Sequence, residues 1–193
     1  MRILPLRGML AAALLAATPT AADAAVSIVG GNSAGRDCFL AAELKRDTRS
    51  SLEICNRALE LDSLTKRDRA ATLVNRGIVY MQSRDLENAI ADYKAAIAMN
   101  PALAEAHINL GIALLHRGGQ DQAAIDTLTR ALDMKPERPE VALYTRAVAY
   151  EMIGKPKAAY EDYSAAAALA PEWKEPAEQL KRFSVERKST ARG

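Results

Sequence analysis

The sequence predicts an all-α protein built as a solenoid of stacked helix pairs, and two observations lead to this prediction. One pattern of small and large residues occurs three times, over about 70–101, 104–136 and 140–171. Pro101 and its equivalents Pro136 and Pro171 close the three units at a constant spacing of 35 residues. A fixed period near this length is typical of stacked helix–turn–helix repeats, which usually present a binding surface.

Each unit carries a small residue, a large one, an alanine, a second large one and a second alanine before its proline. These residues are Gly77, Tyr80, Ala89, Tyr93 and Ala96; then Gly111, Leu114, Ala124, Leu128 and Ala131; then Ala147, Tyr150, Ala159, Tyr163 and Ala166. The pattern resembles the tetratricopeptide repeat family, with repeats over about 66–171. The resemblance implies a right-handed α-solenoid of antiparallel helix pairs with a C-terminal capping helix.

The first 24 residues have the composition of a secretory signal peptide. Arg2 and Arg7 make a basic start, residues 8–17 are a short apolar run, and residues 22–24 read Ala-Asp-Ala, an A-x-A cleavage site. This order is typical of a cleaved export signal. We therefore expect the periplasm, or secretion, as the location, and no integral membrane span after cleavage. An uncleaved anchor is the alternative.

The region after the signal is predicted to form a lead and a degenerate repeat. Residues 25–35 contain three glycines and are expected to be a flexible lead, and residues 36–63 are expected to form a degenerate helical hairpin. Cys38 and Cys55 are the only cysteines. An even pair after an export signal predicts a disulfide. Buried thiols are the alternative in a cytosolic protein, and the absence of a C-x-x-C spacing disfavours a redox-active pair.

The C-terminal residues 172–188 have an amphipathic pattern. Trp173, Ala177, Leu180 and Phe183 recur at helical spacing, with charged residues on the other side. Repeat arrays need a terminal element with a polar outer face, so we expect a capping helix. A partner-binding helix is the alternative. Residues 189–193 are expected to be a frayed tail.

Two repeats carry a correlated pair of charges. Arg76 occurs with Asp92, and Arg146 with Asp162, whereas the second repeat has Leu110 and Thr127 at these places. In the family these positions lie on facing helices of one hairpin. The resemblance therefore implies ion pairs inside the first and third hairpins, and the alternative is unrelated solvated charges.

In this family the first helices of the repeats line a concave groove. Carried onto this chain, the resemblance implies a mostly apolar groove that binds a protein or peptide partner, with the lining residues Val74, Asn75, Ile78, Met81, Ile108, Asn109, Ile112, Leu115, Tyr144 and Val148. Asn75 and Asn109 share one position. Their amides have the donor and acceptor that an extended peptide backbone needs. The alternative is that they brace neighbouring helices.

Composition and motifs favour binding over catalysis. His107 and His116 lie nine residues apart, too far to form a metal pair, and the sequence has no nucleophile elbow, Walker motif or zinc signature. We therefore expect no catalytic residue, no metal and no cofactor. Cleavage removes two arginines and one aspartate from a net charge of +2, which leaves +1 and gives no electrostatic case for nucleic acid.

The sequence thus predicts a non-catalytic protein-interaction module, or scaffold, of the cell envelope. An apolar small-ligand or lipid carrier is the first alternative. The second is a structural, self-associating protein whose groove is filled by its own chain. The oligomeric state and the identity of the partner stay open at this point.

Overall fold

The computed structural model describes residues 2–5, 33–44, 48–60 and 64–186, which form helices and one pair of short strands. In chain order the elements are β1 (Arg2–Pro5), α1 (Ser33–Glu43), α2 (Thr48–Glu60), α3 (Lys66–Gln82), α4 (Leu86–Met99), α5 (Ala104–Arg117), α6 (Asp121–Asp133), α7 (Pro139–Met152), α8 (Pro156–Leu169), α9 (Lys174–Leu180) and β2 (Phe183–Glu186).

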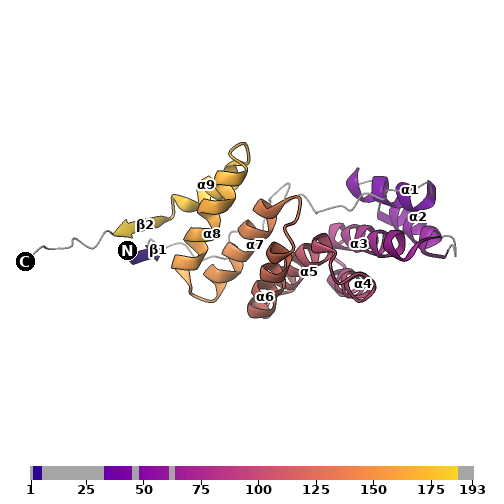
Figure 1. The fold of residues 1–193 in the computed structure, drawn as a ribbon, viewed down its shortest axis with the longest axis horizontal. Helices are drawn as coiled ribbons and strands as arrows, with labels where there is room; N and C mark the ends of the chain where they lie inside the picture. Colours follow the sequence, from indigo (N-terminus) through magenta and orange to yellow (C-terminus); the bar gives the residue numbers. More distant parts are fainter. Residues whose placement is uncertain (1, 6–32, 45–47, 61–63, 187–193) are drawn as a thin grey trace, which may run out of the picture.

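The helices pack as successive pairs along one long axis (Figure 1). Helices α1 and α2, α3 and α4, α5 and α6, and α7 and α8 contact each other as hairpins, and each hairpin contacts the next. The first helices α3, α5 and α7 also contact one another in sequence order. The predicted α-solenoid is confirmed.

Local sequence features start the helices and turn the chain between them. The hydroxyl oxygen of Thr65 accepts a hydrogen bond from the Asp68 backbone N–H at 3.1 Å, which caps α3. Pro139 and Pro156 begin α7 and α8, where a missing N–H costs nothing. The turn before α8 contains Gly154 at φ 70°, a conformation that strains side-chain-bearing residues.

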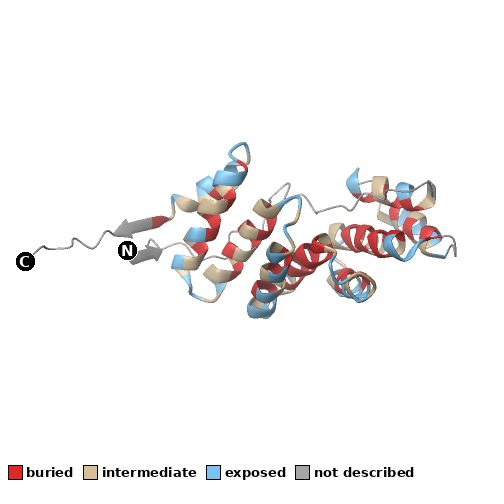
Figure 2. Ribbon diagram, viewed as in Figure 1, coloured by how far each residue is buried: buried red, intermediate tan, exposed pale blue. Residues whose placement is uncertain are grey.

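The core of each hairpin pairs a small residue with a large one. A Cβ added to Gly77 would lie 2.4 Å from Tyr93 Cε1, and one added to Gly111 would lie 2.6 Å from Leu128 Cγ. Both large side chains are fully buried. Figure 2 shows the buried residues gathered where helices of neighbouring pairs meet. The repeated small residue is therefore what lets the two helices of a hairpin approach.

The C-terminal end differs from the capping helix predicted over 172–188. Helix α9 covers only Lys174–Leu180, and the strand β2 follows after Lys181 and Arg182. The chain turns at Lys181 and Arg182, so Phe183 is not part of the helix. It is buried beside the rings of Tyr160 and Tyr163 on α8. An aromatic residue followed by Ser-Val-Glu suits a strand once a backbone partner is present.

Aromatic side chains seal this end of the solenoid. The ring centroids of Tyr144 and Trp173 lie 4.8 Å apart, and those of Tyr160 and Phe183 lie 5.8 Å apart. Tyr163 donates a hydrogen bond to Glu151 Oε2 at 2.8 Å, and burial together with that carboxylate raises the pKa of Tyr163. The cluster covers the last hairpin in place of a further repeat.

The strands β1 and β2 pair antiparallel, with Arg2 opposite Glu186 and Pro5 opposite Phe183. Strand β1 also contacts α8. It lies within the predicted signal peptide, so this pairing belongs to the uncleaved chain. The rest of that signal, residues 25–32 of the predicted lead, and the predicted tail 189–193 lie outside the described residues. The predicted lead is too long at its end, because α1 begins at Ser33 and Ala34 packs against the core.

Candidate functional site

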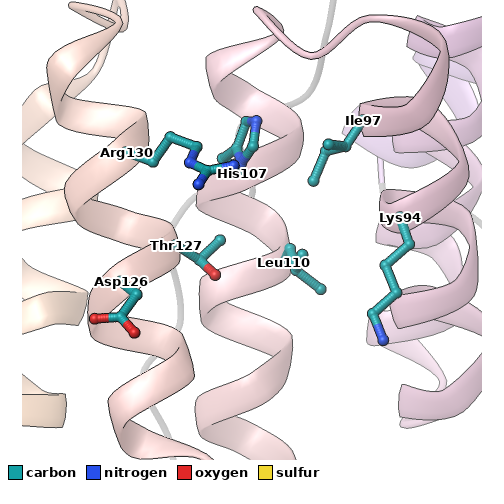
Figure 3. A pocket seen from close by; sticks show the side chains of 7 residues that line it. All are labelled: Lys94, Ile97, His107, Leu110, Asp126, Thr127 and Arg130. Carbon is teal, nitrogen blue, oxygen red and sulfur yellow. The ribbon is translucent and has the colours of Figure 1, made fainter.

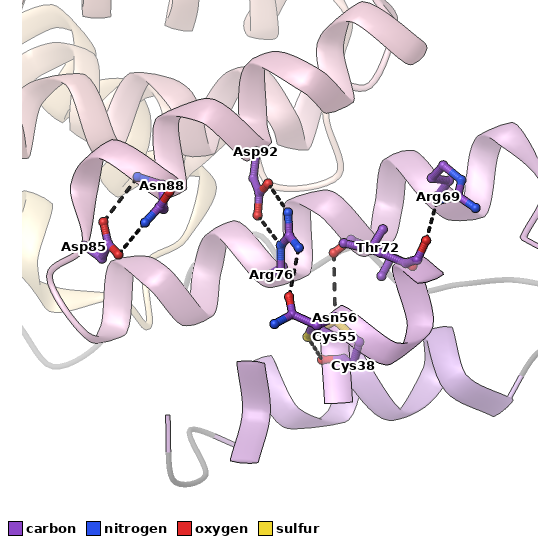
Figure 4. Close-up of polar contacts among 10 residues, drawn as sticks. Cys38, Cys55, Asn56, Arg69, Thr72, Arg76, Asp85, Asn88 and Asp92 are labelled. Carbon is purple, nitrogen blue, oxygen red and sulfur yellow. Dashed lines mark hydrogen bonds and ion pairs between the residues drawn. A yellow bond between two sulfur atoms is a disulfide. The ribbon is translucent and has the colours of Figure 1, made fainter. Parts of the chain in front are cut away.

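The N-terminal hairpin is held by a disulfide. Cys38 on α1 and Cys55 on α2 are bonded to each other, with their Cα atoms 4.7 Å apart (Figure 4). Both side chains are fully buried. The bond joins the two helices of the unit that has only one neighbouring repeat, so its place is structural.

Both ion pairs expected from the sequence are present in the structure. Arg76 donates from Nε and Nη2 to the two carboxylate oxygens of Asp92, at 2.8 and 2.7 Å (Figure 4). Arg146 donates to Asp162 in the same way, at 2.7 and 2.9 Å. The hydrogen bonds with the aspartates raise the pKa of each arginine. Such two-pronged, charge-assisted bonds fix the angle between the helices of a hairpin.

Each arginine also bonds to the preceding hairpin, which sequence reasoning missed. Arg76 Nη1 donates to Asn56 Oδ1 on α2, and Arg146 Nη1 donates to Thr129 Oγ1 on α6, both at 2.9 Å. Cys55 aligns with Tyr93 and Leu128 of the later units, and Asn56 and Thr129 directly follow Cys55 and Leu128. A hydrogen-bond acceptor at this one position was therefore the available signal.

The residues predicted to line an apolar groove are mostly buried rather than open. In the described chain the buried ones are Val74, Asn75, Ile78, Ile108, Asn109, Ile112 and Tyr144, and the half-buried ones are Met81, Leu115 and Val148. They come from α3, α5 and α7, and the stacking of these helices brings them to one side of the array. We name this set the first-helix face.

The two asparagines of the first-helix face are among its most buried members. Asn75 is 0% exposed and Asn109 is 1% exposed, and both take part in interactions. A buried amide is expected to have its hydrogen bonds made. The exposed residue next to the face is Met152, at 47%. In the full chain an external ligand would therefore meet Met152 and the half-buried residues first.

A separate pocket, which was not predicted from the sequence, opens between α4, α5 and α6. Its volume is about 260 Å³, and its lining residues are Lys94, Ile97, His107, Leu110, Asp126, Thr127 and Arg130. Figure 3 shows Lys94 and Ile97 on one wall, Asp126, Thr127 and Arg130 on the other, and His107 and Leu110 between them. The two walls come from α4 and α6, the second helices of their hairpins, so the pocket does not belong to the first-helix face.

The histidines have the surroundings of structural residues. His107 is 3% exposed, and its Nε2 lies 3.0 Å from the carbonyl oxygen of Pro101, so Nε2 carries the proton and donates. His116 lies at the exposed end of α5. Among the described residues no three His, Cys, Asp or Glu side chains come together as a metal site.

A helix crosses a membrane only if it is long and apolar enough. Within the described ranges, each helix is either too short or too polar to pass through a bilayer.

Comparison with known proteins places the repeats in a family. Residues 74–139 match the model for the tetratricopeptide repeat. Photosystem I assembly protein Ycf3 of Prochlorococcus marinus (strain NATL2A) is 36% identical over 83 residues, which are 43% of this chain and 47% of that protein. Human (Homo sapiens) tetratricopeptide repeat protein 6 is 34% identical over 86 residues, 45% of this chain and 16% of that protein. The chain thus spans less than half the length of these curated relatives.

Solved structures share the fold over a larger part of the chain. A crystal structure of MamA superimposes with a TM-score of 0.61 at 25% identity, over 72% of this chain and 80% of MamA. A double mutant of MamA RS-1 gives a TM-score of 0.63 at 18% identity, over 78% and 83% of the two chains. The 35-residue period and the stacked hairpins agree with the family match over residues 74–139, so this part of the chain consists of tetratricopeptide repeats, and the solved structures share the fold.

Proposed function

We propose that this chain is a non-catalytic protein-binding module of the cell envelope that receives a segment of a protein or peptide partner on its first-helix face. The observation that carries the proposal is the stacking of α3, α5 and α7, which puts equivalent residues of three repeats side by side. Such a surface suits an extended or helical segment. The relative Ycf3 is named as an assembly protein, which supports a role in bringing proteins together.

The envelope part of the proposal is supported by two features. Residues 1–24 have the order of a cleaved export signal, and the disulfide between Cys38 and Cys55 suits an oxidising compartment. N-terminal sequencing of the protein purified from its native host tests this part. We expect a start at Ala25, and a start at Met1 in a cytosolic fraction would contradict it.

The partner site is tested with substitutions at the half-buried Val148 and the exposed Met152. Val148→Glu and Met152→Glu add charge to the first-helix face, and Leu169→Glu adds the same charge on α8, where Leu169 is 57% exposed. Ile112 is unsuitable, because it is 5% exposed and its replacement would report on folding. We expect the two face variants to lose the partner in affinity purification from the native host while circular dichroism stays unchanged. Loss with Leu169→Glu as well would contradict the assignment of this face.

One observation favours a second candidate, in which the face is occupied by the chain's own N-terminal lead. Seven of the ten predicted lining residues are buried in the 193-residue chain. Strand β1 contacts α8 near one end of the array, and Ser33 begins α1 at the other end (Figure 1). The first-helix face lies between these two ends of the array.

Hydrogen exchange on residues 25–193 and on residues 33–193 distinguishes the two candidates, because the shorter chain lacks most of the lead and keeps α1. If the lead covers the face, α3, α5 and α7 should exchange faster in the shorter chain. The partner proposal expects equal protection of these helices in the two chains.

A further inference from the structure

We propose that the pocket between α4, α5 and α6 binds an acidic side chain of a partner protein, a carboxylate on an apolar stem. Its walls are Lys94 and Ile97 on α4 and Thr127 and Arg130 on α6, over Leu110. This site lies apart from the first-helix face and differs from it in chemistry. It therefore does not depend on the function proposed for that face.

The pocket lies at the junction between the hairpin of α3 and α4 and the hairpin of α5 and α6. The junctions before and after it contain an arginine at the equivalent place. At the junction before it, Arg76 spans Asp92 of its own hairpin and Asn56 of the preceding one. At the junction after it, Arg146 spans Asp162 and Thr129 in the same way. In both places the guanidinium also lies over a tyrosine ring, at 5.8 and 5.7 Å from the ring centroids of Tyr80 and Tyr150.

All four equivalent positions differ at the junction that holds the pocket. Leu110 stands in place of the arginine, Thr127 in place of the aspartate, and Leu114 in place of the tyrosine. Lys94 stands where Asn56 and Thr129 provide a hydrogen-bond acceptor. The junction has thus lost a charged cross-link and gained a cation, and part of the volume that an arginine fills elsewhere is open.

The charges around the pocket favour an anion. Lys94 and Arg130 are exposed, and neither forms an ion pair with any residue in the described part of the chain. The acid on the rim, Asp126, accepts a hydrogen bond from Gln122 Nε2 at 2.9 Å. The Thr127 hydroxyl donates to the carbonyl oxygen of Ala123 at 2.7 Å.

The remaining donors of the pocket belong to the two cations. His107 Nε2 donates to Pro101, so its proton is already used. Figure 3 shows Arg130 beside His107 on one wall and the ammonium of Lys94 toward the opposite end of the other wall, so each cation can donate a charge-assisted hydrogen bond to a carboxylate that enters on its side. The side chains of Leu110 between the walls and Ile97 on the α4 wall offer contact to an apolar stem.

The size of the pocket favours a side chain over a cofactor. Its volume of about 260 Å³ lies below the roughly 300–1,000 Å³ that is usual for small-molecule and cofactor sites. The site is also open along two exposed helices, α4 and α6, where the backbone of a partner can lie. A glutamate side chain, with two methylenes before its carboxylate, suits a pocket that has apolar side chains and a cation on each wall.

The test is an NMR titration of isotope-labelled residues 25–193 with two blocked peptides, acetyl-Leu-Glu-Leu-amide and acetyl-Leu-Gln-Leu-amide. We expect the Glu peptide to shift the amide signals of Leu110 and Thr127, with a Kd on the order of 1 mM for a single side-chain site. We expect the Gln peptide to bind at least about fivefold more weakly, because it lacks the charge. Equal binding of the two peptides, or no shift at these residues, would overturn the proposal.

Two double variants and one control separate the pocket from general charge effects. Leu110→Arg with Thr127→Asp installs the arginine and aspartate of the other repeats and should abolish binding of the Glu peptide with helicity retained. Lys94→Glu with Arg130→Glu should abolish it as well, and it keeps the apolar side chains of the pocket intact. Lys155→Glu with Lys174→Glu makes the same charge change at exposed lysines elsewhere and should leave binding unchanged.

The source of the carboxylate is tested with free hexanoate. The proposal expects hexanoate to bind more weakly than the Glu peptide, because it lacks the contacts of a backbone along α4 and α6. Hexanoate binding as tight as that of the peptide would assign the site to a small carboxylate and would contradict a protein partner. Binding of the Glu peptide to the variant with Leu110→Arg and Thr127→Asp would contradict the location.

Discussion

The ion pair between Arg76 and Asp92 gives a prediction whose size follows from the structure. Asp92 is 6% exposed, and the side chain of Arg76 is 22% exposed. Asp92→Ala removes two charge-assisted hydrogen bonds, each worth about 1.5–3 kcal/mol in a folded protein. The guanidinium keeps its bond to Asn56 and can turn toward water, so the loss stays below the roughly 3–5 kcal/mol of a fully buried pair. We expect Asp92→Ala to lower the free energy of unfolding by about 2–3 kcal/mol.

A double-mutant cycle separates the pair from its surroundings. Arg76→Ala should cost slightly more, about 3 kcal/mol, because it also removes the bond to Asn56 and the contact with Tyr80. We expect a coupling energy of about 1.5–2 kcal/mol between Arg76 and Asp92. Urea unfolding of residues 25–193 measures the global free energy. Hydrogen exchange in α3 and α4 measures the local one, because repeat arrays can open unit by unit.

The second repeat supplies a matched control within the same chain. Leu110 and Thr127 occupy the equivalent positions and cannot form an ion pair. The same cycle on these two residues should give a coupling near zero. A coupling below about 0.3 kcal/mol between Arg76 and Asp92, or an equal coupling in the second repeat, would refute the reasoning.

Two further predictions concern the disulfide and the small residue of the hairpin core. Replacing Cys38 and Cys55 with serine should destabilise the protein by roughly 3 kcal/mol, the value for a loop of this size, and hydrogen exchange should show α1 opening first; unchanged protection of α1 would contradict a structural role. Gly77→Ala should cost about 1–3 kcal/mol in urea unfolding through overpacking against Tyr93, whereas the equivalent Ala147→Gly should cost about 1 kcal/mol through helix propensity alone. A stabilised Gly77→Ala variant would show that the two helices of this hairpin can separate without loss.

The repeat architecture could be predicted from the sequence because its physical causes recur within one chain. A small residue such as Gly77 must face a large one such as Tyr93, and this requirement returns at a spacing of about 35 residues. The same repetition made the correlation between Arg76 and Asp92 visible, since the second repeat lacks both charges. Local packing rules therefore account for the hairpins and for their order.

The accessibility of the first-helix face could not be predicted in this way. Repeat position indicates which side of a helix a residue occupies, whereas exposure depends on everything that packs there in three dimensions. Val74, Ile108 and Asn109 are nearly or fully buried for this reason. The pairing of β1 with β2 likewise joins segments from opposite ends of the chain, for which neither segment carries a local signal.

The sequence contains part of the signal for the pocket, because the second repeat differs from the others at Leu110 and Thr127. The exception at Leu110 and Thr127 predicted a missing ion pair, and the structure shows a cavity at that place. The sequence alone did not show that Lys94 lies at the same junction, because Lys94 belongs to the preceding hairpin. Only the bonds of Arg76 to Asn56 and of Arg146 to Thr129 show that each junction involves three helices.

The central claim is that this solenoid holds a protein partner on its first-helix face, and site-specific photocrosslinking in the native host tests it most directly. A photoreactive amino acid is placed at Met152, beside the face, and in a second strain at Leu169 on α8. We predict that Met152 crosslinks to one defined protein, that Leu169 does not, and that Val148→Glu abolishes the Met152 crosslink. The same crosslinks from both positions, or a Met152 crosslink that survives Val148→Glu, would contradict the claim.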